Sequence, residues 1–257
     1  MTLRPVADVD PPPFHVLNRT GGARALLVCD HASNALPRGC GSLGIAHKKM
    51  FEHIAWDVGA AAVTRRLADL LDAPAIMGGA SRLFVDLNRY PDDPTAIAEY
   101  SDGTHVTGNS DLSAAERTRR LDWHRAYHGQ LETMIAGFGD ATPVLLFIHS
   151  FTPRIGDHQR PWHLGVLHDG NSPESDALLT WLRLRDDLVT GDNQPYSVDQ
   201  PPSFSIFTHA IDPGRPYIAL EIRQDLIETV EDAERWADLI AEALKESLSP
   251  GRFFGQD

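Results

Sequence analysis

The stretch VLLFIH at residues 144–149 decides the fold that we expect for this chain. It follows Pro143 and stays apolar for five positions, which is typical of a short strand buried on both faces in the middle of a sheet. Similar apolar runs predict further strands at residues 25–29, 75–77, 83–87, 163–167 and 217–222. The chain therefore has enough strands for one continuous sheet.

Segments with the character of helices alternate with these strands. Apolar residues recur every three or four positions from about residue 46 to 71, and the capping-box sequence SAAE at residues 113–116 begins a segment that runs to about residue 135. Two more helices are expected at about residues 173–184 and 229–248. This alternation predicts an α/β fold, a three-layer sandwich with helices on both faces of a mixed, largely parallel sheet. The polar stretch between Arg89 and Leu112 is interpreted as a loop that could act as a lid.

Length and composition bound the function. The 257 residues show no repeat or linker, so we expect a single domain over residues 1–257, with residues 1–20 as an extended N-terminal segment. A formal charge of −13 disfavours nucleic acid and anionic membranes as partners. The N-terminus lacks the apolar core of a signal peptide, no apolar run could span a membrane, and there are only two cysteines. A cytoplasmic location fits these features.

Polar residues stand at the carboxyl ends of four expected strands, where ligands bind in open α/β sheets. They are Asp30 and His31 after the first strand, Asp86, Asn88 and Arg89 after LFV, His149 and Ser150 after VLLFI, and Glu221 within IALEIR. Two histidines, a carboxylate and an arginine at one edge of a sheet suit metal-assisted hydrolysis. We therefore predict a zinc hydrolase.

The chemistry of such a site assigns a role to each residue. The neutral imidazoles of His31 and His149 would hold Zn²⁺, which lowers the pKa of a bound water toward about 7. Glu221 would take the proton of that water and later pass it to the leaving amine. Arg82 or Arg89 would bind a substrate carboxylate through its planar guanidinium.

Each of these residues also has a structural interpretation. A histidine at a strand end is often a hydrogen-bonded structural residue, and Asn88 with Arg89 can form a turn that ends a strand. Glu221 lies inside an apolar run, where an unpaired carboxylate is costly, so it could instead form a salt bridge with Arg223 or another arginine. The combination of all these residues favours the functional interpretation.

Five strings spread over most of the chain resemble the N-formylglutamate amidohydrolase family, in the same order. They are CDHASNALP at residues 29–37, SRLFVDLNR at 81–89, IHSFTP at 148–153, DNQPYS at 192–197 and ALEIRQDLI at 219–227. The resemblance implies a fold similar to zinc carboxypeptidases and the aspartoacylase group. In those relatives a His-x-x-Glu pair and a later His bind zinc, an Asn-Arg pair and a second Arg bind the substrate carboxylate, and a late Glu is the general base.

Carried over position by position, the resemblance assigns roles to six residues. It implies that His31 and His149 are metal ligands, that Glu221 is the catalytic base, and that Asn88, Arg89 and Arg82 bind the substrate. His128 and His209 also stand where the family often has histidine, and either could bind substrate or donate to the oxyanion. A weaker alternative is a zinc site on one helix formed by His124 and His128, four positions apart, although the glutamate of an H-E-x-x-H motif is missing.

The chain departs from the family pattern at position 34. The glutamate ligand of the relatives is replaced by Asn34, a neutral and poorer zinc ligand than a carboxylate. Asp30, beside His31, or Asp57, in the expected first long helix, could take its place. We favour Asp57.

Together these features predict a metal-dependent amidohydrolase that removes a formyl or other short acyl group from an acidic amino acid such as N-formylglutamate. Its cofactor would be a divalent metal, with zinc favoured by the ligand types, and its partner a small N-acyl substrate bearing a carboxylate. Two alternatives stay open. One is a related hydrolase of another N-acyl or peptide substrate, and the other is a catalytically silent binding protein on this scaffold.

Overall fold

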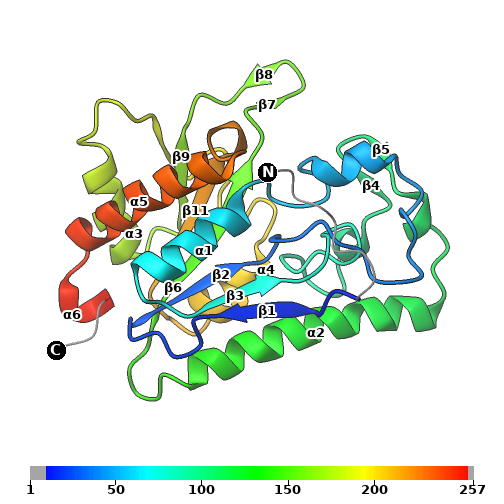
Figure 1. The fold of residues 1–257 in the computed structure, drawn as a ribbon, viewed down its shortest axis with the longest axis horizontal. Coiled ribbons are helices and arrows are strands. Elements are labelled where there is room, and N and C mark those ends of the chain that lie inside the picture. The colour runs from blue at the N-terminus through cyan, green and yellow to red at the C-terminus, as the bar shows by residue number, and fades with distance from the viewer. Residues whose placement is uncertain (1–9, 254–257) are drawn as a thin grey trace.

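A single mixed sheet organises the computed structural model, which describes residues 10–253 (Figure 1). Its strand order is β1-β3-β2-β6-β11-β9-β10. The strands are β1 Phe14–Leu17, β2 Ala25–Cys29, β3 Ala75–Gly78, β6 Val144–Phe151, β9 Leu164–Leu167, β10 Thr190–Asp192 and β11 Tyr217–Arg223. The four central strands β3, β2, β6 and β11 run parallel, whereas β1 and β9 lie antiparallel to their neighbours β3 and β11. The predicted mixed, largely parallel sheet is therefore confirmed.

Helices cover both faces of the sheet, as the alternating pattern predicts. The helices α1 Ala60–Leu70, α3 Pro173–Leu182 and α5 Val230–Ser247 pack on one face, and α2 Ala114–Ala136 with the short α4 Phe204–Ile206 packs on the other (Figure 1). Strand β6 serves both cores, because Leu146 and Ile148 face the α1/α5 layer while Leu145 and Phe147 face the α2 layer. The architecture is a three-layer α/β sandwich.

Shorter elements fill the connections. They are the 3₁₀ helices His47–Phe51, Pro94–Ile97, Thr107–Asn109 and Gln224–Leu226, the π-helix Phe207–Ile211, the terminal helix α6 Pro250–Phe253, and the hairpins β4 Tyr100–Ser101 with β5 Thr104–His105 and β7 Arg154–Ile155 with β8 His158–Gln159. The expected loop after Arg89 is thus partly structured. Among the described residues, no helix is both long enough and apolar enough to cross a membrane.

The prediction of a helix from about residue 46 to 71 is wrong for its first half. Residues 47–51 form a 3₁₀ helix, and α1 begins only at Ala60. Gly59 ends the irregular segment between them with a φ of 83°, a left-handed conformation that a regular helix does not contain. Asp57 therefore lies in a loop before α1 and not on a helix face.

The strand expected at residues 83–87 is also wrong. These residues form turns that begin at Ser81, whose hydroxyl oxygen accepts a hydrogen bond from the Leu83 amide. Their apolar side chains are buried because Phe84 and Leu87 pack into the α2 layer without joining the sheet. The edge strands β1 and β10 were not expected. β1 lies within the segment expected to be extended, of which residues 1–9 are outside the described residues.

Two glycines test the importance of the loop that ends at Gly59. A Cβ at Gly59 would lie 2.2 Å from the Ile227 carbonyl oxygen, whereas a Cβ at Gly129, exposed on α2, would meet nothing within 4 Å. We expect Gly59→Ala to lower the free energy of unfolding by about 2 kcal/mol or more. Gly129→Ala should raise it by about 0.5–1 kcal/mol, because alanine favours the helix. Urea denaturation of both variants measures these opposite signs, and equal effects would contradict the strain at Gly59.

Candidate active site

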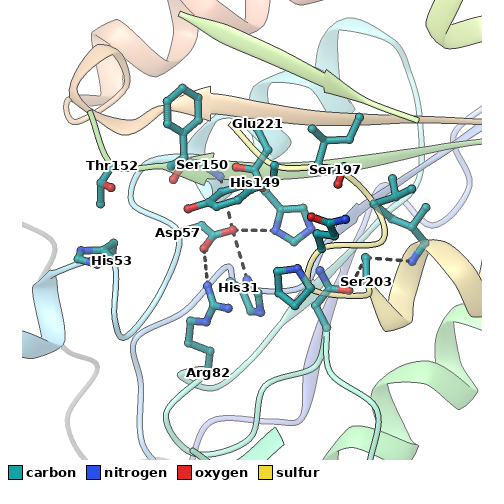
Figure 2. A pocket seen from close by; sticks show the side chains of 18 of the residues that line it. His31, His53, Asp57, Arg82, His149, Ser150, Thr152, Ser197, Ser203 and Glu221 are labelled. Atoms are coloured by element: carbon teal, nitrogen blue, oxygen red, sulfur yellow. Dashed lines mark hydrogen bonds and ion pairs between the residues drawn. The ribbon is translucent and has the colours of Figure 1, made fainter. Parts of the chain in front are cut away.

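The carboxyl ends of β2, β6 and β11 bring the predicted residues to one pocket. His31 follows β2, His149 lies near the end of β6, and Glu221 on β11 stands opposite His149 in the parallel register. Asp57 joins them from the loop before α1. In Figure 2 the Asp57 carboxylate lies between the rings of His31 and His149 and the guanidinium of Arg82.

One carboxylate oxygen is shared by two buried imidazoles. Asp57 Oδ2 lies 2.8 Å from His149 Nδ1 and 3.3 Å from His31 Nδ1. All three side chains are buried, and one ligand atom of each lies within 4.8 Å of the others. The cluster could hold a metal ion, since two imidazole nitrogens and a carboxylate oxygen are the usual ligands of catalytic zinc.

A second carboxylate stands behind each ring. His31 Nε2 lies 2.8 Å from Asp86 Oδ1, and His149 Nε2 lies 3.6 Å from Asp30 Oδ2. The Tyr127 hydroxyl holds Asp30 in place by donating to its Oδ1 at 2.8 Å. Asp86 favours a hydrogen on His31 Nε2, and the Nδ1 atoms of both rings face Asp57, so a hydrogen or a cation has to lie between these nitrogens and the carboxylate. Histidines that bind metals are commonly oriented by carboxylates in this way.

The cluster strongly favours positive charge. Burial lowers the pKa of His149, but Asp30 and Asp57 outweigh it and raise that pKa well above its ordinary value. Burial and Arg82 likewise lower the pKa of His31, while Asp86 and Asp57 reverse the shift. Burial raises the pKa of Asp57, and the two imidazoles depress it further than burial raises it. Protons or a divalent cation can supply the positive charge that compensates these carboxylates.

Glu221 differs from the other carboxylates. Burial raises its pKa to about 7, and Asp57 adds to the shift, although His149, Arg82 and His31 oppose it. Its Oε2 has no hydrogen-bond partner among the described residues, and neither do Asp30 Oδ2 and His149 Nε2 beside it. Among the described residues Glu221 forms no ion pair with an arginine, and Arg223 pairs with Asp225 at 2.8 Å instead. A buried carboxyl group poised near neutral pH can exchange a proton with a bound molecule.

Of the three candidates for the third ligand, Asp57 is the residue in the cluster. The Asn34 amide donates to the Met50 carbonyl oxygen at 2.8 Å, so it serves the backbone of the neighbouring loop. Asp30 lies behind His149. Two contacts fasten the Asp57 loop to its neighbours, one from the Asp57 amide to the His31 carbonyl oxygen and one from the Ser150 hydroxyl to the Val58 carbonyl oxygen.

The two candidate substrate arginines differ in their partners. The Arg82 guanidinium donates to Asp86 Oδ2 at 2.7 and 3.1 Å and approaches Asp57 Oδ1 at 3.4 Å, so carboxylates of the site already occupy it. Arg89 lines the pocket, and among the described residues the only hydrogen bond of its guanidinium goes to the Asn88 carbonyl oxygen. The Asn88 side-chain oxygen accepts from the Ser203 hydroxyl at 2.6 Å and the Ser205 amide at 3.0 Å. Arg89 is therefore the arginine open to a ligand.

The cavity beside these groups is small, with a volume of about 190 Å³. This is less than the 300–1,000 Å³ that is usual for drug-sized ligands. Apolar side chains form part of its wall, including Phe151, Ile155, Leu167, Val198 and Ile206. A small molecule with one charged end and a short apolar part would fit these surroundings.

His128 and His209 are not among the residues that line this cavity. They contact each other on the α2 side of the sheet, with His128 Nδ1 and His209 Nε2 2.8 Å apart. His124 and His128 lie with their rings 4.3 Å apart, yet among residues 10–253 the only cluster suited to a metal is that of His31, Asp57 and His149. Sequence patterns place Asp86 among the polar residues at strand ends but assign it no role. They do not single out Tyr127 or the pocket residues His53 and Tyr196.

Comparisons with known proteins identify the family of this chain. The family model for N-formylglutamate amidohydrolase matches residues 23–228. A search of curated proteins gave no match. Among solved structures, the chain is similar to the gene product Atu2144 of Agrobacterium tumefaciens, with 32% sequence identity, a TM-score of 0.88, and coverage of 92% of this chain and 94% of that chain.

A second crystal structure supports the fold alone. It is that of N-formylglutamate amidohydrolase from Ralstonia eutropha JMP134, with 17% identity, a TM-score of 0.66, and coverage of 93% of this chain and 100% of that chain. The family model spans most of the chain, and His31, Asp57, Arg89, His149 and Glu221 all lie within the matched region. The chain therefore belongs to the N-formylglutamate amidohydrolase family, whose members are hydrolases of amide bonds.

Proposed function

We propose that the protein is a metal-dependent amidohydrolase that removes a formyl or other short acyl group from an acidic amino acid such as N-formylglutamate. The observation that carries the proposal is the convergence of His31 Nδ1, His149 Nδ1 and Asp57 Oδ2 in one buried cluster beside Glu221. The family supports the amide bond as the target. The small cavity favours a substrate of amino-acid size over a peptide.

His31, His149 and Asp57 are the residues that would hold the metal. Their donor types fit zinc, and the unpartnered Glu221 Oε2 beside them leaves a polar atom free for a further ligand or a water. When bound, a divalent ion polarises the acyl carbonyl and lowers the pKa of a water molecule. Asp86 and Asp30 keep the two rings in the orientation that directs Nδ1 to Asp57.

Glu221 handles the protons of the reaction. As a carboxylate it takes one proton from the attacking water, whose oxygen forms the new bond to the acyl carbon. It then gives that proton to the nitrogen of the amino acid as the C–N bond breaks, so the products are a short carboxylic acid and a free amine. Its pKa of about 7, raised by burial, suits both steps near neutral pH.

Arg89 would bind the carboxylate of the substrate, with Asn88 beside it. Arg82 instead forms ion pairs with Asp86 and Asp57, which would hold the Asp57 carboxylate in place beside the two histidines. This local positive charge lets a chain with a formal charge of −13 accept an anionic substrate.

The first prediction concerns metal binding. The protein, stripped of metal and titrated with Zn²⁺ against a chromophoric chelator, should bind one ion per chain. Asp57→Asn and His149→Ala should abolish stoichiometric binding, and Asp86→Asn should weaken it about 10–100-fold by loosening His31. Asn34→Ala is the control and should bind like wild type, because the Asn34 amide donates to the Met50 carbonyl oxygen and faces away from the cluster formed by His31, Asp57 and His149. Loss of zinc in Asn34→Ala with retention in Asp57→Asn would place the site elsewhere.

The second prediction separates catalysis from metal binding. Glu221→Gln cannot accept a proton, so kcat for N-formylglutamate should fall about 10²–10⁴-fold while zinc content is unchanged. The same exchange at the exposed Glu231, which pairs with Arg235 on α5, should leave kcat at the wild-type value. A Glu221→Gln enzyme that keeps about a tenth or more of wild-type kcat would remove Glu221 from the role of base.

The third prediction distinguishes the two arginines. Arg89→Ala should raise KM for N-formylglutamate about 10–100-fold, because a charged hydrogen bond to the substrate is lost, and should leave stability nearly unchanged. Arg82→Ala should lower the free energy of unfolding by about 3 kcal/mol, because Asp86 and Asp57 lose a buried partner. Steady-state kinetics and urea denaturation on both variants provide the test. The reverse pattern would exchange their roles.

A further inference from the structure

The substrate-binding segment at residues 86–89 has no regular structure of its own. The Asn88 amide donates to Asp86 Oδ1 at 2.9 Å, and the Asn88 side chain is held by Ser203 and Ser205 as described above. The backbone carbonyl groups of Leu87 and Arg89, on either side of Asn88, still need donors because they lie outside any sheet. The groups that donate hydrogen bonds to these two carbonyl oxygens therefore fix the orientation of Asn88 and Arg89.

Two histidines of α2 supply the donors. His128 Nε2 lies 2.8 Å from the Leu87 carbonyl oxygen, and His124 Nε2 lies 3.0 Å from the Arg89 carbonyl oxygen. A carbonyl oxygen can only accept, so both Nε2 atoms carry hydrogen. The two histidines are four positions apart on one face of α2, and the ring of Phe204 packs against both of them.

The contacts continue from His128 to the protein surface. His128 Nδ1 lies 2.8 Å from His209 Nε2 in the π-helix, and His209 Nδ1 lies 2.6 Å from Glu132 Oε1 on α2. Burial lowers the pKa of His128 to about 3, so its ring is neutral and its Nδ1 accepts a hydrogen from His209. Arg215 donates to both the Glu132 carboxylate and the His209 carbonyl oxygen.

The contacts that run from Leu87 to Glu132 require three hydrogen atoms. Three contacts each need one hydrogen, namely Leu87 to His128, His128 to His209, and His209 to Glu132. Two neutral imidazoles supply only two N–H groups, so a third hydrogen lies between His209 Nδ1 and Glu132 Oε1. Burial lowers the pKa of His209 below its ordinary value, because the Glu132 carboxylate and Asp30 offset the effect of burial only in part and Arg215 opposes them. The third hydrogen is therefore assigned from the 2.6 Å contact between His209 Nδ1 and Glu132 Oε1.

We propose that His124 and His128, with His209 and a proton shared with Glu132 behind them, are positioning residues that hold the Leu87 and Arg89 carbonyls and so direct Arg89 into the pocket. This proposal rests on the proposed role of Arg89 in substrate binding. It gives His128 and His209 a different role from the direct substrate contact expected from the sequence. None of His124, His128, His209 and Glu132 lines the pocket, and hydrogen bonds to the Leu87 and Arg89 carbonyls connect the network to it.

Glu132 provides the sharpest test, because its side chain is 45% exposed and replacements there should fold. In Glu132→Gln the amide can donate to His209 Nδ1, which satisfies every contact without the extra proton. Glu132→Leu has the same loss of charge but no donor or acceptor. Glu246→Leu is a matched control, because Glu246 accepts from Trp181 on the opposite layer, remote from the pocket.

Two measurements are made on these zinc-loaded proteins. Glu132→Leu should raise KM for N-formylglutamate between about twofold and tenfold with kcat nearly unchanged, and should speed hydrogen exchange in the peptide that contains residues 86–90. Glu132→Gln and Glu246→Leu should match wild type in both. His128→Leu, if it folds, should show a larger effect of the same kind.

Three other results are possible, and each contradicts either the positioning role of the network, the role of the shared hydrogen, or the proposed function. If Glu132→Leu matches wild type in exchange and in KM, the network does not position the segment. If Glu132→Gln behaves like Glu132→Leu, charge rather than the shared hydrogen is responsible. If the wild-type enzyme does not act on N-acyl amino acids, the proposed function fails, and the exchange rates alone still decide whether Glu132 holds residues 86–89.

Discussion

The site depends on one atom, the buried Asp57 Oδ2, which faces two imidazoles at once. A carboxylate oxygen in that position is tolerated only where positive charge meets it, since burial of an unpaired charge is costly. Several features of the fold serve this requirement. Parallel pairing of β2 and β6 brings the two histidines to one edge, Gly59 turns the chain so that α1 starts just beyond Asp57, and Arg82 neutralises the outer oxygen.

The buried charges are divided between two tasks. Asp30, Asp57 and Asp86 keep their negative charge because histidines and Arg82 surround them, and they favour positive charge on the neighbouring imidazoles. Glu221 lacks such a partner, and burial holds its pKa near 7. The same low-dielectric edge of the sheet thus holds carboxylates that stay charged beside one that can exchange a proton, a separation typical of hydrolytic sites.

The two helical layers support different residues of the pocket. The loop that leads into α1 carries Asp57, whereas α2 and the segment after Ser203 hold Asn88 and Arg89. The strand ends of the sheet carry His149 and Glu221 between these two groups. Because Tyr127 of α2 also holds Asp30 behind His149, the α2 layer supports both sides of the pocket.

Local patterns predict the architecture and single out many of the side chains that meet in the pocket. Continuous apolar strands such as residues 144–149 and the cap at the start of α2 depend on neighbouring residues alone, and polar residues at parallel strand ends must share an edge. The folded structure settles three questions that these patterns leave open: Asp57 and not Asn34 faces the histidines, residues 83–87 turn instead of pairing, and Arg82 is occupied while Arg89 is open. The position of Asp57 depends on Arg82 and His149, which lie 25 and 92 positions away along the chain, and no local pattern specifies such partners.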